Sequence, residues 1–240
     1  IPNSEMPREL KGKSGPFLFV LGASYHHKNR PFAVRAIVEM LKRGWQGTLI
    51  LAGPTPPVGS SLGLEAAEFL ADTDLRKSVV QLASLSESQK RWIFENASLM
   101  LYPTIVEGFG LVPFEAANYG LASLSTRQGS LNEILPTNIP TINSFDPSEF
   151  ADQILTLLSD DAERARIVSR ISETGKIYTA EATSDLLVEM FLDMTSRPPK
   201  RTAAIVGEDI HFSSWVPGLS PVSVPINRVV PPGFLVRIGW

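Results

Sequence analysis

Residues 99–120 read LMLYPTIVEGFGLVPFEAANYG. The first four residues are apolar and end at Pro103, which is typical of a buried strand. Gly108 and Gly110 permit backbone conformations that are closed to other residues, and they let a ligand approach the main chain. Pro113 suits the first turn of a helix, where its missing N–H is no loss. The segment therefore predicts a buried strand, a glycine-bearing turn and the start of a helix.

Two carboxylates flank this turn, because Glu107 lies before it and Glu115 follows eight residues later, just inside the helix. Ionised carboxylates only accept hydrogen bonds, and the vicinal hydroxyls of a sugar or ribose are natural donors to them. The helix start also offers unpaired N–H groups to a phosphate. The pattern favours a nucleotide sugar as ligand. Spacing alone supports an alternative equally well, in which Glu107 is a surface-loop residue and Glu115 is a residue stabilised by the helix dipole.

The segments Glu-Gly-Phe-Gly-Leu at 107–111 and Pro-Phe-Glu-Ala at 113–116 resemble the glutamate–seven–glutamate signature of retaining GT-B glycosyltransferases, and of glycosyltransferase family four in particular. The resemblance covers about residues 17–195. It implies the C-terminal, nucleotide-sugar-binding half of such an enzyme, a hexosyltransferase of polysaccharide biosynthesis that retains anomeric configuration. In that family the first glutamate contacts the donor sugar and the second contacts the ribose, which would be the roles of Glu107 and Glu115.

A second candidate loop, GASYHHKN, follows the first predicted strand. Gly22 and Lys28 match the glycine and lysine of the family's loop, and Lys28 would neutralise a diphosphate. The alternative for Lys28 is a solvated lysine before a helix. Ala23 departs from the family, because an arginine commonly stands there. His27 or Arg30 could supply the missing cation.

The resemblance implies one site built from both loops. Its predicted catalytic residues are Glu107 and Lys28. Its predicted donor-binding residues are Gly22, Lys28, Glu107, Gly108, Phe109, Gly110, Leu111 and Glu115. A nucleobase would lie near Ser84 and Leu85.

Other residues near these loops are expected to be structural. Phe109, Phe114 and Tyr119 are predicted to pack in the core rather than to stack on a ligand. Ser130 and Glu133 have the spacing of a capping box at the start of a helix.

Several other classes of protein fit the chain poorly. Adjacent His26 and His27 lack a carboxylate partner at ligand spacing, so they are a weak signal for a metal. The resemblance implies no metal and no cofactor, with the nucleotide diphosphate sugar as a substrate. No Gly-x-Gly-x-x-Gly or P-loop motif is present, which disfavours dehydrogenases and P-loop NTPases. Two alternatives stay open: a non-catalytic nucleotide-sugar-binding or scaffolding module, which Ala23 favours, and a nucleotide-sugar epimerase, which the lack of a proton-abstracting set opposes.

The composition of the chain limits which binding partners and which cellular compartment are expected. The net charge of −3 provides no general basic field that would recruit nucleic acid or an anionic membrane. The chain contains no cysteine, which fits a reducing compartment, and we expect the cytoplasm. No apolar run is long enough to cross a bilayer, and the N-terminus lacks a signal-peptide pattern.

Apolar runs alternate with helical patterns, which predicts an α/β fold with a Rossmann-like parallel sheet and helices on both faces. Strands are predicted at 17–21, 48–52, 79–83, 99–102 and 121–125, with a short extended piece at 141–145. Helices are predicted at 31–43, 64–77, 161–176 and 180–195, with others starting after Ser86, Ser130 and Asp146 and one that has Pro113 in its first turn.

Three regions are predicted: a polar linker at 1–13, a donor-binding domain at 14–196 and a tail at 197–240 that holds 7 of the 19 prolines. The tail either packs on the domain or leads to another one, with extended pieces at 203–206 and 234–238. We expect an N-terminal acceptor-binding domain outside this chain. Peripheral membrane association through that missing part is left open.

Overall fold

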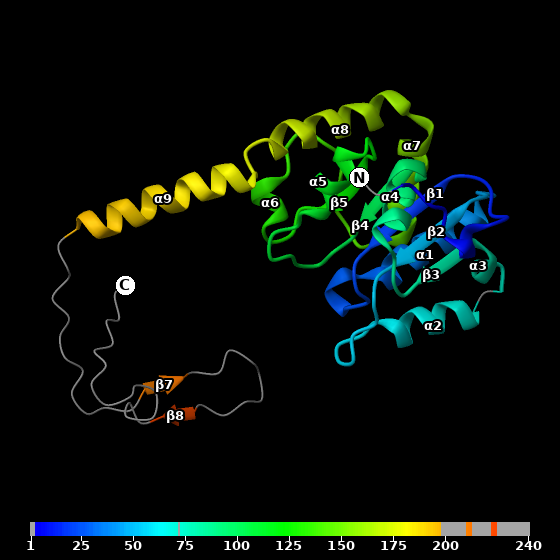
Figure 1. The fold of residues 1–240 in the computed structure, drawn as a ribbon. Helices are drawn as coiled ribbons and strands as arrows, with labels where there is room; N and C mark the ends of the chain where they lie inside the picture. The colour runs from blue at the N-terminus through cyan, green and yellow to red at the C-terminus, as the bar shows by residue number, and fades with distance from the viewer. Residues whose placement is uncertain (1–2, 72, 198–209, 213–221, 225–240) are drawn as a thin grey trace. The chain divides into compact units, whose positions relative to one another are not determined.

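The computed structural model describes residues 3–71, 73–197, 210–212 and 222–224. Contacts between residues divide the chain into two compact units, 1–180 and 181–240. Figure 1 labels most of their helices and strands. The site residues predicted from sequence all lie in the first unit.

The first unit is built on a parallel sheet, which in the described residues has six strands. In chain order they are β1 (Phe17–Leu21), β2 (Thr48–Ala52), β3 (Val79–Leu82), β4 (Leu99–Tyr102), β5 (Ser123–Thr126) and β6 (Thr141–Ile142). Their spatial order is β3-β2-β1-β4-β5-β6. This is a Rossmann-like order, so the predicted fold class is confirmed. The order reverses between β1 and β4, and ligands of such sheets bind outside the strand carboxyl ends at that point.

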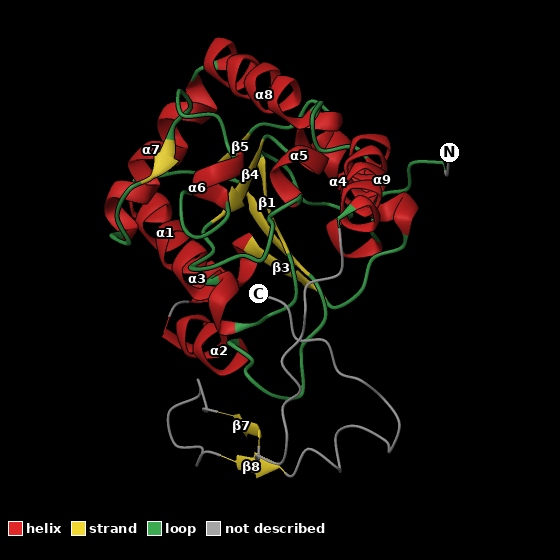
Figure 2. Ribbon diagram, turned by 90° about the vertical axis from the view of Figure 1, so that its left-hand side faces the viewer, coloured by secondary structure: helices red, strands yellow, loops and turns green. Residues whose placement is uncertain are grey.

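Helices cover both faces of this sheet, with α1 and α7 on one side and α4 on the other (Figure 2). The helices of the first unit are η1 (Arg8–Leu10), η2 (His26–Lys28), α1 (Arg30–Lys42), α2 (Leu62–Ala71), α3 (Thr73–Ser78), α4 (Glu87–Asn96), α5 (Val112–Asn118), α6 (Leu131–Ile134), α7 (Pro147–Ser159) and α8 (Asp161–Gly175). Alternate residues of each central strand enter different cores: Leu18 and Val20 face α1 and α7, whereas Phe19 faces α4. Every residue of β2, β4 and β5 is buried, as expected for strands covered on both faces.

Several element boundaries differ from the prediction by a few residues. The region predicted as a helix at 64–77 is helical in its described residues, which form α2 and α3. The strand predicted at 121–125 begins at Ser123, although Leu121 and Ala122 are also buried.

Two of the predicted helix caps are formed. Ser86 and Gln89 make a reciprocal capping box at the start of α4, and Asp146 accepts hydrogen bonds from the first turn of α7. The predicted capping box of Ser130 and Glu133 is wrong, because the Ser130 hydroxyl makes no cap bond to α6. That hydroxyl donates instead to the carbonyls of Glu107 and Phe109, at 3.1 and 2.7 Å.

Part of the segment predicted as a linker packs on the sheet, because Leu10 of η1 is fully buried beside Phe19.

Within the described residues, the second unit contains one helix and one pair of strands. Helix α9 (Ala180–Ser196) has no buried residue, and β7 (Ile210–Phe212) pairs antiparallel with β8 (Val222–Val224). The extended pieces predicted at 203–206 and 234–238 lie outside the described residues. Among the helices that are described, none has the length and apolar character needed to cross a bilayer.

Candidate functional site

The loop after β1 brings Lys28 to the carboxyl edge of the sheet. Gly22 has φ +147°, and a Cβ there would lie 3.4 Å from the Lys28 side chain. The alkyl chain of Lys28 therefore lies along the Gly22 backbone. The loop after β2 supports this arrangement, since Ser61 donates from both its N–H and its hydroxyl to the carbonyl of Ser24, at 2.7 and 3.1 Å.

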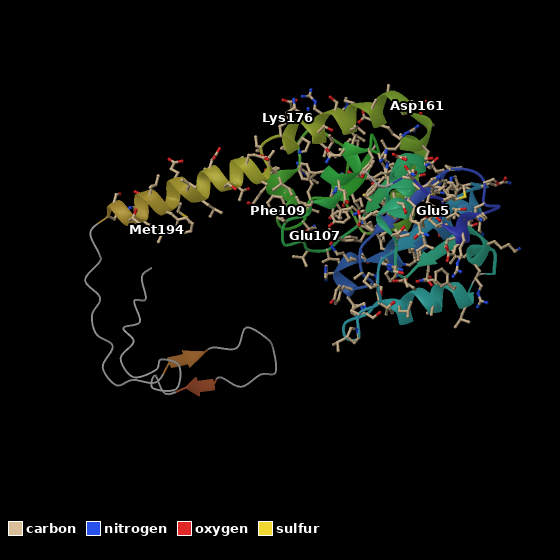
Figure 3. The ribbon with its side chains drawn as sticks, in the orientation of Figure 1. Glu5, Glu107, Phe109, Asp161, Lys176 and Met194 are labelled. Atoms are coloured by element: carbon tan, nitrogen blue, oxygen red, sulfur yellow. The ribbon has the colours of Figure 1, made fainter. Side chains whose placement is uncertain are left out.

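The loop after β4 carries Glu107 and is fastened to its neighbours on two sides. Ser130 holds the Glu107 and Phe109 carbonyls, as described above, and Figure 3 labels both residues in this loop. On the other side, the backbone N–H of Ile105 donates to the carbonyl of His27 at 2.7 Å. The β1 and β4 loops are thus joined through their main chains.

Lys28 and Glu107 meet where the strand order reverses. Their ion pair measures 2.5 Å from Nζ to Oε1, and the two side chains are only 17% and 10% exposed. Thr104 Oγ1 lies 2.9 Å from the same carboxylate oxygen, and Nζ of Lys28 donates to the Tyr102 hydroxyl at 3.5 Å. The Lys28 ammonium lies 5.4 Å from the centroid of the Tyr102 ring, which adds a cation–π contact.

These contacts shift two pKa values in opposite directions. Burial alone would raise the pKa of Glu107, but hydrogen bonds from Lys28, Tyr102 and Thr104, together with the charge of Lys28, lower it below its ordinary value. Burial raises the pKa of Tyr102 strongly, and the nearby Glu107 carboxylate raises it further. At neutral pH the cluster therefore holds an ionised Glu107 and a neutral Tyr102 phenol.

The lowered pKa of Glu107 predicts a pH-dependent contribution to stability. A carboxyl group with a depressed folded-state pKa stabilises the fold above its unfolded value, about 4.3 for glutamate, and this contribution is lost as pH falls through the folded value. At pH 7 the free energy of unfolding should therefore be higher for wild type than for Glu107→Gln, and this difference should shrink as the pH is lowered to 3. Urea denaturation of both proteins at several pH values measures this. A difference that stays constant over that range would contradict the prediction.

The two glycines of the motif have different roles. Gly110 has φ +96°, and a Cβ there would lie 2.4 Å from Cδ2 of Leu131. Gly108 has no positive φ, and a Cβ there would meet no atom within 4 Å. Both glycines permit backbone conformations that are closed to other residues, but only Gly110 adopts one.

Gly110→Ala should destabilise the protein by about 1–3 kcal/mol, because alanine is strained at positive φ and Leu131 must move. Gly108→Ala is the matched control, and it should change stability by less than about 0.5 kcal/mol, as a surface substitution does. Thermal or urea unfolding of the two variants checks both values. An equal loss of stability in both variants would show that Gly110 is not under a stricter backbone constraint than Gly108.

Glu115 lies in the first turn of α5, and its side chain is 35% exposed. Its Oε1 is 2.9 Å from Nζ of Lys90 on α4, and Lys90 also pairs with Glu87 at 3.0 Å. Leu111 at the N-cap position offers no side-chain hydrogen bond to the first turn of α5. The structure therefore brings Glu115 together with Lys90 rather than with Glu107.

The aromatic residues of the motif only partly follow the prediction. Phe114 is buried as expected, but Phe109 is 43% exposed and Tyr119 is 39% exposed. Phe109 lies in a loop outside the sheet, and its ring makes a T-shaped contact with the ring of Tyr178, with centroids 5.4 Å apart. Tyr119 stacks on Phe94 at the end of α5. The prediction that both are core residues is wrong, because each presents one side to solvent.

The cations proposed to replace the missing arginine at Ala23 have other contacts. Arg30 is buried and pairs with the buried Glu65 at 3.0 Å. The ring of His27 stacks on Tyr25, while its carbonyl accepts the hydrogen bond from the backbone N–H of Ile105. Within the described residues, no group of three or more histidine, aspartate or glutamate side chains is placed to hold a metal.

Sequence reasoning missed three residues of this site: Tyr102, Thr104 and Lys90. Tyr102 ends a predicted strand and Thr104 follows it closely, so their position at the sheet's carboxyl edge could have pointed to them. Lys90 carries no such signal, because it lies on another helix and reaches Glu115 only through packing.

Comparison with known proteins places the chain in a family. Residues 15–160 match the family model described as Glycosyl transferases group 1. The chain belongs to this family. It is similar to the gpi3 subunit of phosphatidylinositol N-acetylglucosaminyltransferase from Schizosaccharomyces pombe, with 25% identity over 143 residues. It is also similar to D-inositol 3-phosphate glycosyltransferase from Corynebacterium urealyticum, with 27% identity over 161 residues.

These alignments cover 60% and 65% of the chain but 30% and 37% of the relatives, so the chain spans about a third of their length. A solved C-terminal domain of a glycosyl transferase group 1 protein, LpcC from Francisella tularensis, has a TM-score of 0.60 at 19% identity and covers 74% of this chain and 96% of that one. Anabaena HepE, solved in complex with UDP-glucose, has a TM-score of 0.64 at 16% identity, covering 74% and 48%. At such identities the likeness shows the fold, the Rossmann-like half of a GT-B architecture.

Proposed function

We propose that this chain is the nucleotide-sugar-binding half of a retaining glycosyltransferase of family four, which transfers a hexose from a nucleotide diphosphate sugar to an acceptor. The observation that carries the proposal is the Lys28–Glu107 ion pair at the reversal of strand order. It places a cation and a hydroxyl-binding carboxylate at the point where such a sheet binds its ligand. A sugar diphosphate needs both groups.

Each residue has a distinct part in this proposal. The Lys28 ammonium has three N–H donors, so it can keep Glu107 and still donate to a diphosphate. The Glu107 carboxylate accepts from Lys28 and Thr104, and a carboxylate has about four acceptor sites, which leaves capacity for a sugar hydroxyl. Glu115 holds the ribose. Lys28 stabilises charge on the leaving diphosphate, and the departing phosphate helps deprotonate the acceptor.

The relatives support this proposal without deciding the donor. Anabaena HepE has been solved with UDP and with UDP-glucose, and the curated relatives include mannosyltransferases. We propose that a domain outside these 240 residues binds the acceptor. The isolated chain should then bind donor weakly and should not turn it over.

Thermal unfolding of the chain with UDP, GDP, UDP-glucose and GDP-mannose tests donor binding. A ligand present at 100 times its dissociation constant stabilises the fold by about 2.7 kcal/mol. Lys28→Met should abolish this shift. The matched control is Lys42→Met, whose lysine is 64% exposed in a surface pair with Glu39. A wild-type chain that no nucleotide stabilises would refute the proposal.

One observation favours a second candidate, a non-catalytic nucleotide-sugar-binding module. Ala23 lacks the cation common in the family, and Arg30 cannot replace it without leaving the buried Glu65. Such a module would bind nucleotide sugars but leave them intact. A transfer assay on the longer protein separates the two, because donor binding without turnover favours the module.

A further inference from the structure

Lys90 joins two elements that border the proposed nucleotide site. It lies on α4, which follows β3, and its Nζ is 2.9 Å from Oε1 of Glu115 on α5, which follows β4. Glu87, one turn earlier on α4, approaches the same ammonium at 3.0 Å. The lysine is 24% exposed, whereas Glu87 is 74% exposed. Glu115 is therefore the better shielded of its two partners.

The start of α4 is held in place by its own contacts, so it gives Lys90 a fixed position. The Ser86–Gln89 capping box closes its first turn, and the backbone N–H of Lys90 donates to the Ser86 carbonyl at 2.9 Å. Further along the helix, Ile93 and Phe94 are buried against the sheet. The ammonium therefore projects from an anchored helix, a few residues after the loop proposed to meet the nucleobase.

The partner carboxylate is less constrained without this lysine. Glu115 is partly exposed, and α5 is a short helix whose N-cap residue makes no side-chain bond. A carboxylate that rotates freely loses conformational entropy when it binds a ligand hydroxyl. A carboxylate that is already held in a single orientation avoids this cost. The hydrogen bond with Glu115 also raises the pKa of Lys90, so the lysine stays protonated at neutral pH.

We infer that Lys90 is a positioning residue for Glu115, and that it sets how strongly the site prefers a ribonucleotide over its 2′-deoxy counterpart. This inference rests on the proposed function. Lys90 holds Oε1 of Glu115, so the carboxylate faces the ribose in one orientation. One of its three N–H donors also stays available after Glu87 and Glu115 are satisfied.

Calorimetry with UDP, GDP and their 2′-deoxy forms on the full 240-residue chain tests the inference. Wild type should prefer the ribonucleotide by about tenfold or more, since a hydrogen bond to a charged group contributes about 1.5–3 kcal/mol. Glu115→Gln and Lys90→Met should each reduce this preference to less than about threefold, below the contribution of one such bond. Lys90→Arg should restore most of it, and Glu87→Gln should leave it unchanged.

The outcomes separate the inference from the proposed function. If Glu115→Gln removes the preference while Lys90→Met keeps it, the positioning role is refuted and the nucleotide site stands. If Lys90→Met weakens both nucleotides by the same factor, the lysine is merely structural and the inference is again refuted. A wild-type chain that binds none of the four nucleotides overturns the proposed function, and the inference with it.

Discussion

Glu65→Ala should lower the free energy of unfolding by about 3–5 kcal/mol, the cost of breaking a buried ion pair from one side. Glu65 is fully buried, and its carboxylate accepts from Arg30 at 3.0 Å, from Ser61 at 2.8 Å and from Gln81 at 2.8 Å. Burial already lowers the pKa of Arg30, and the charge of Glu65 opposes that shift. Removing the carboxylate leaves a buried guanidinium without its counter-ion. Urea denaturation at neutral pH measures the loss.

The matched control lies on the same helix. Glu68 pairs with Arg35 at 3.3 Å, but those side chains are 27% and 43% exposed. Glu68→Ala should therefore cost no more than about 1 kcal/mol. The double variant Arg30→Met, Glu65→Leu should be more stable than Glu65→Ala, because it removes the unpaired charge. If Glu65→Ala and Glu68→Ala lower the free energy of unfolding equally, the loss in Glu65→Ala does not come from breaking the buried ion pair.

Glu107→Gln should reduce sugar transfer by the longer protein about 100- to 1000-fold, the range seen when one preorganised charge-stabilising group is removed. Glutamine keeps the size of the side chain but loses the charge that pairs with Lys28 and the full acceptor capacity toward a sugar hydroxyl. The effect should fall mainly on kcat, because Lys28 and Glu115 still hold the diphosphate and the ribose in this proposal. Steady-state kinetics with the donor identified by thermal shift measures it.

A control for this variant is Glu163→Gln on α8, which removes a surface pair with Arg166 and should leave transfer unchanged. Near-normal kcat in Glu107→Gln would contradict the catalytic role and would favour the binding-module alternative. Circular dichroism of each variant at pH 7 confirms that a loss of transfer is not a loss of fold.

Much of the fold could be predicted because its signals are local. The apolar runs at β1, β2 and β4 have the observed boundaries, since strands buried on both faces need uninterrupted apolar residues. The caps at Ser86 and Asp146 were equally readable, because each cap bond joins residues two or three apart in the chain. Ser130 shows the limit of this logic, since the same sequence pattern makes bonds to a loop more than twenty residues away.

By itself, the sequence determined the Rossmann-like sheet and the turn at Gly110, and it singled out Lys28 and Glu107 as candidate site residues. Only the tertiary structure decided that these two, 79 residues apart, form an ion pair, that Glu115 pairs with Lys90, and that Arg30 is held by Glu65. The physical reason is that strand and turn signals act between neighbours in the chain, whereas the partner of a charged side chain depends on which loops the strand order brings together.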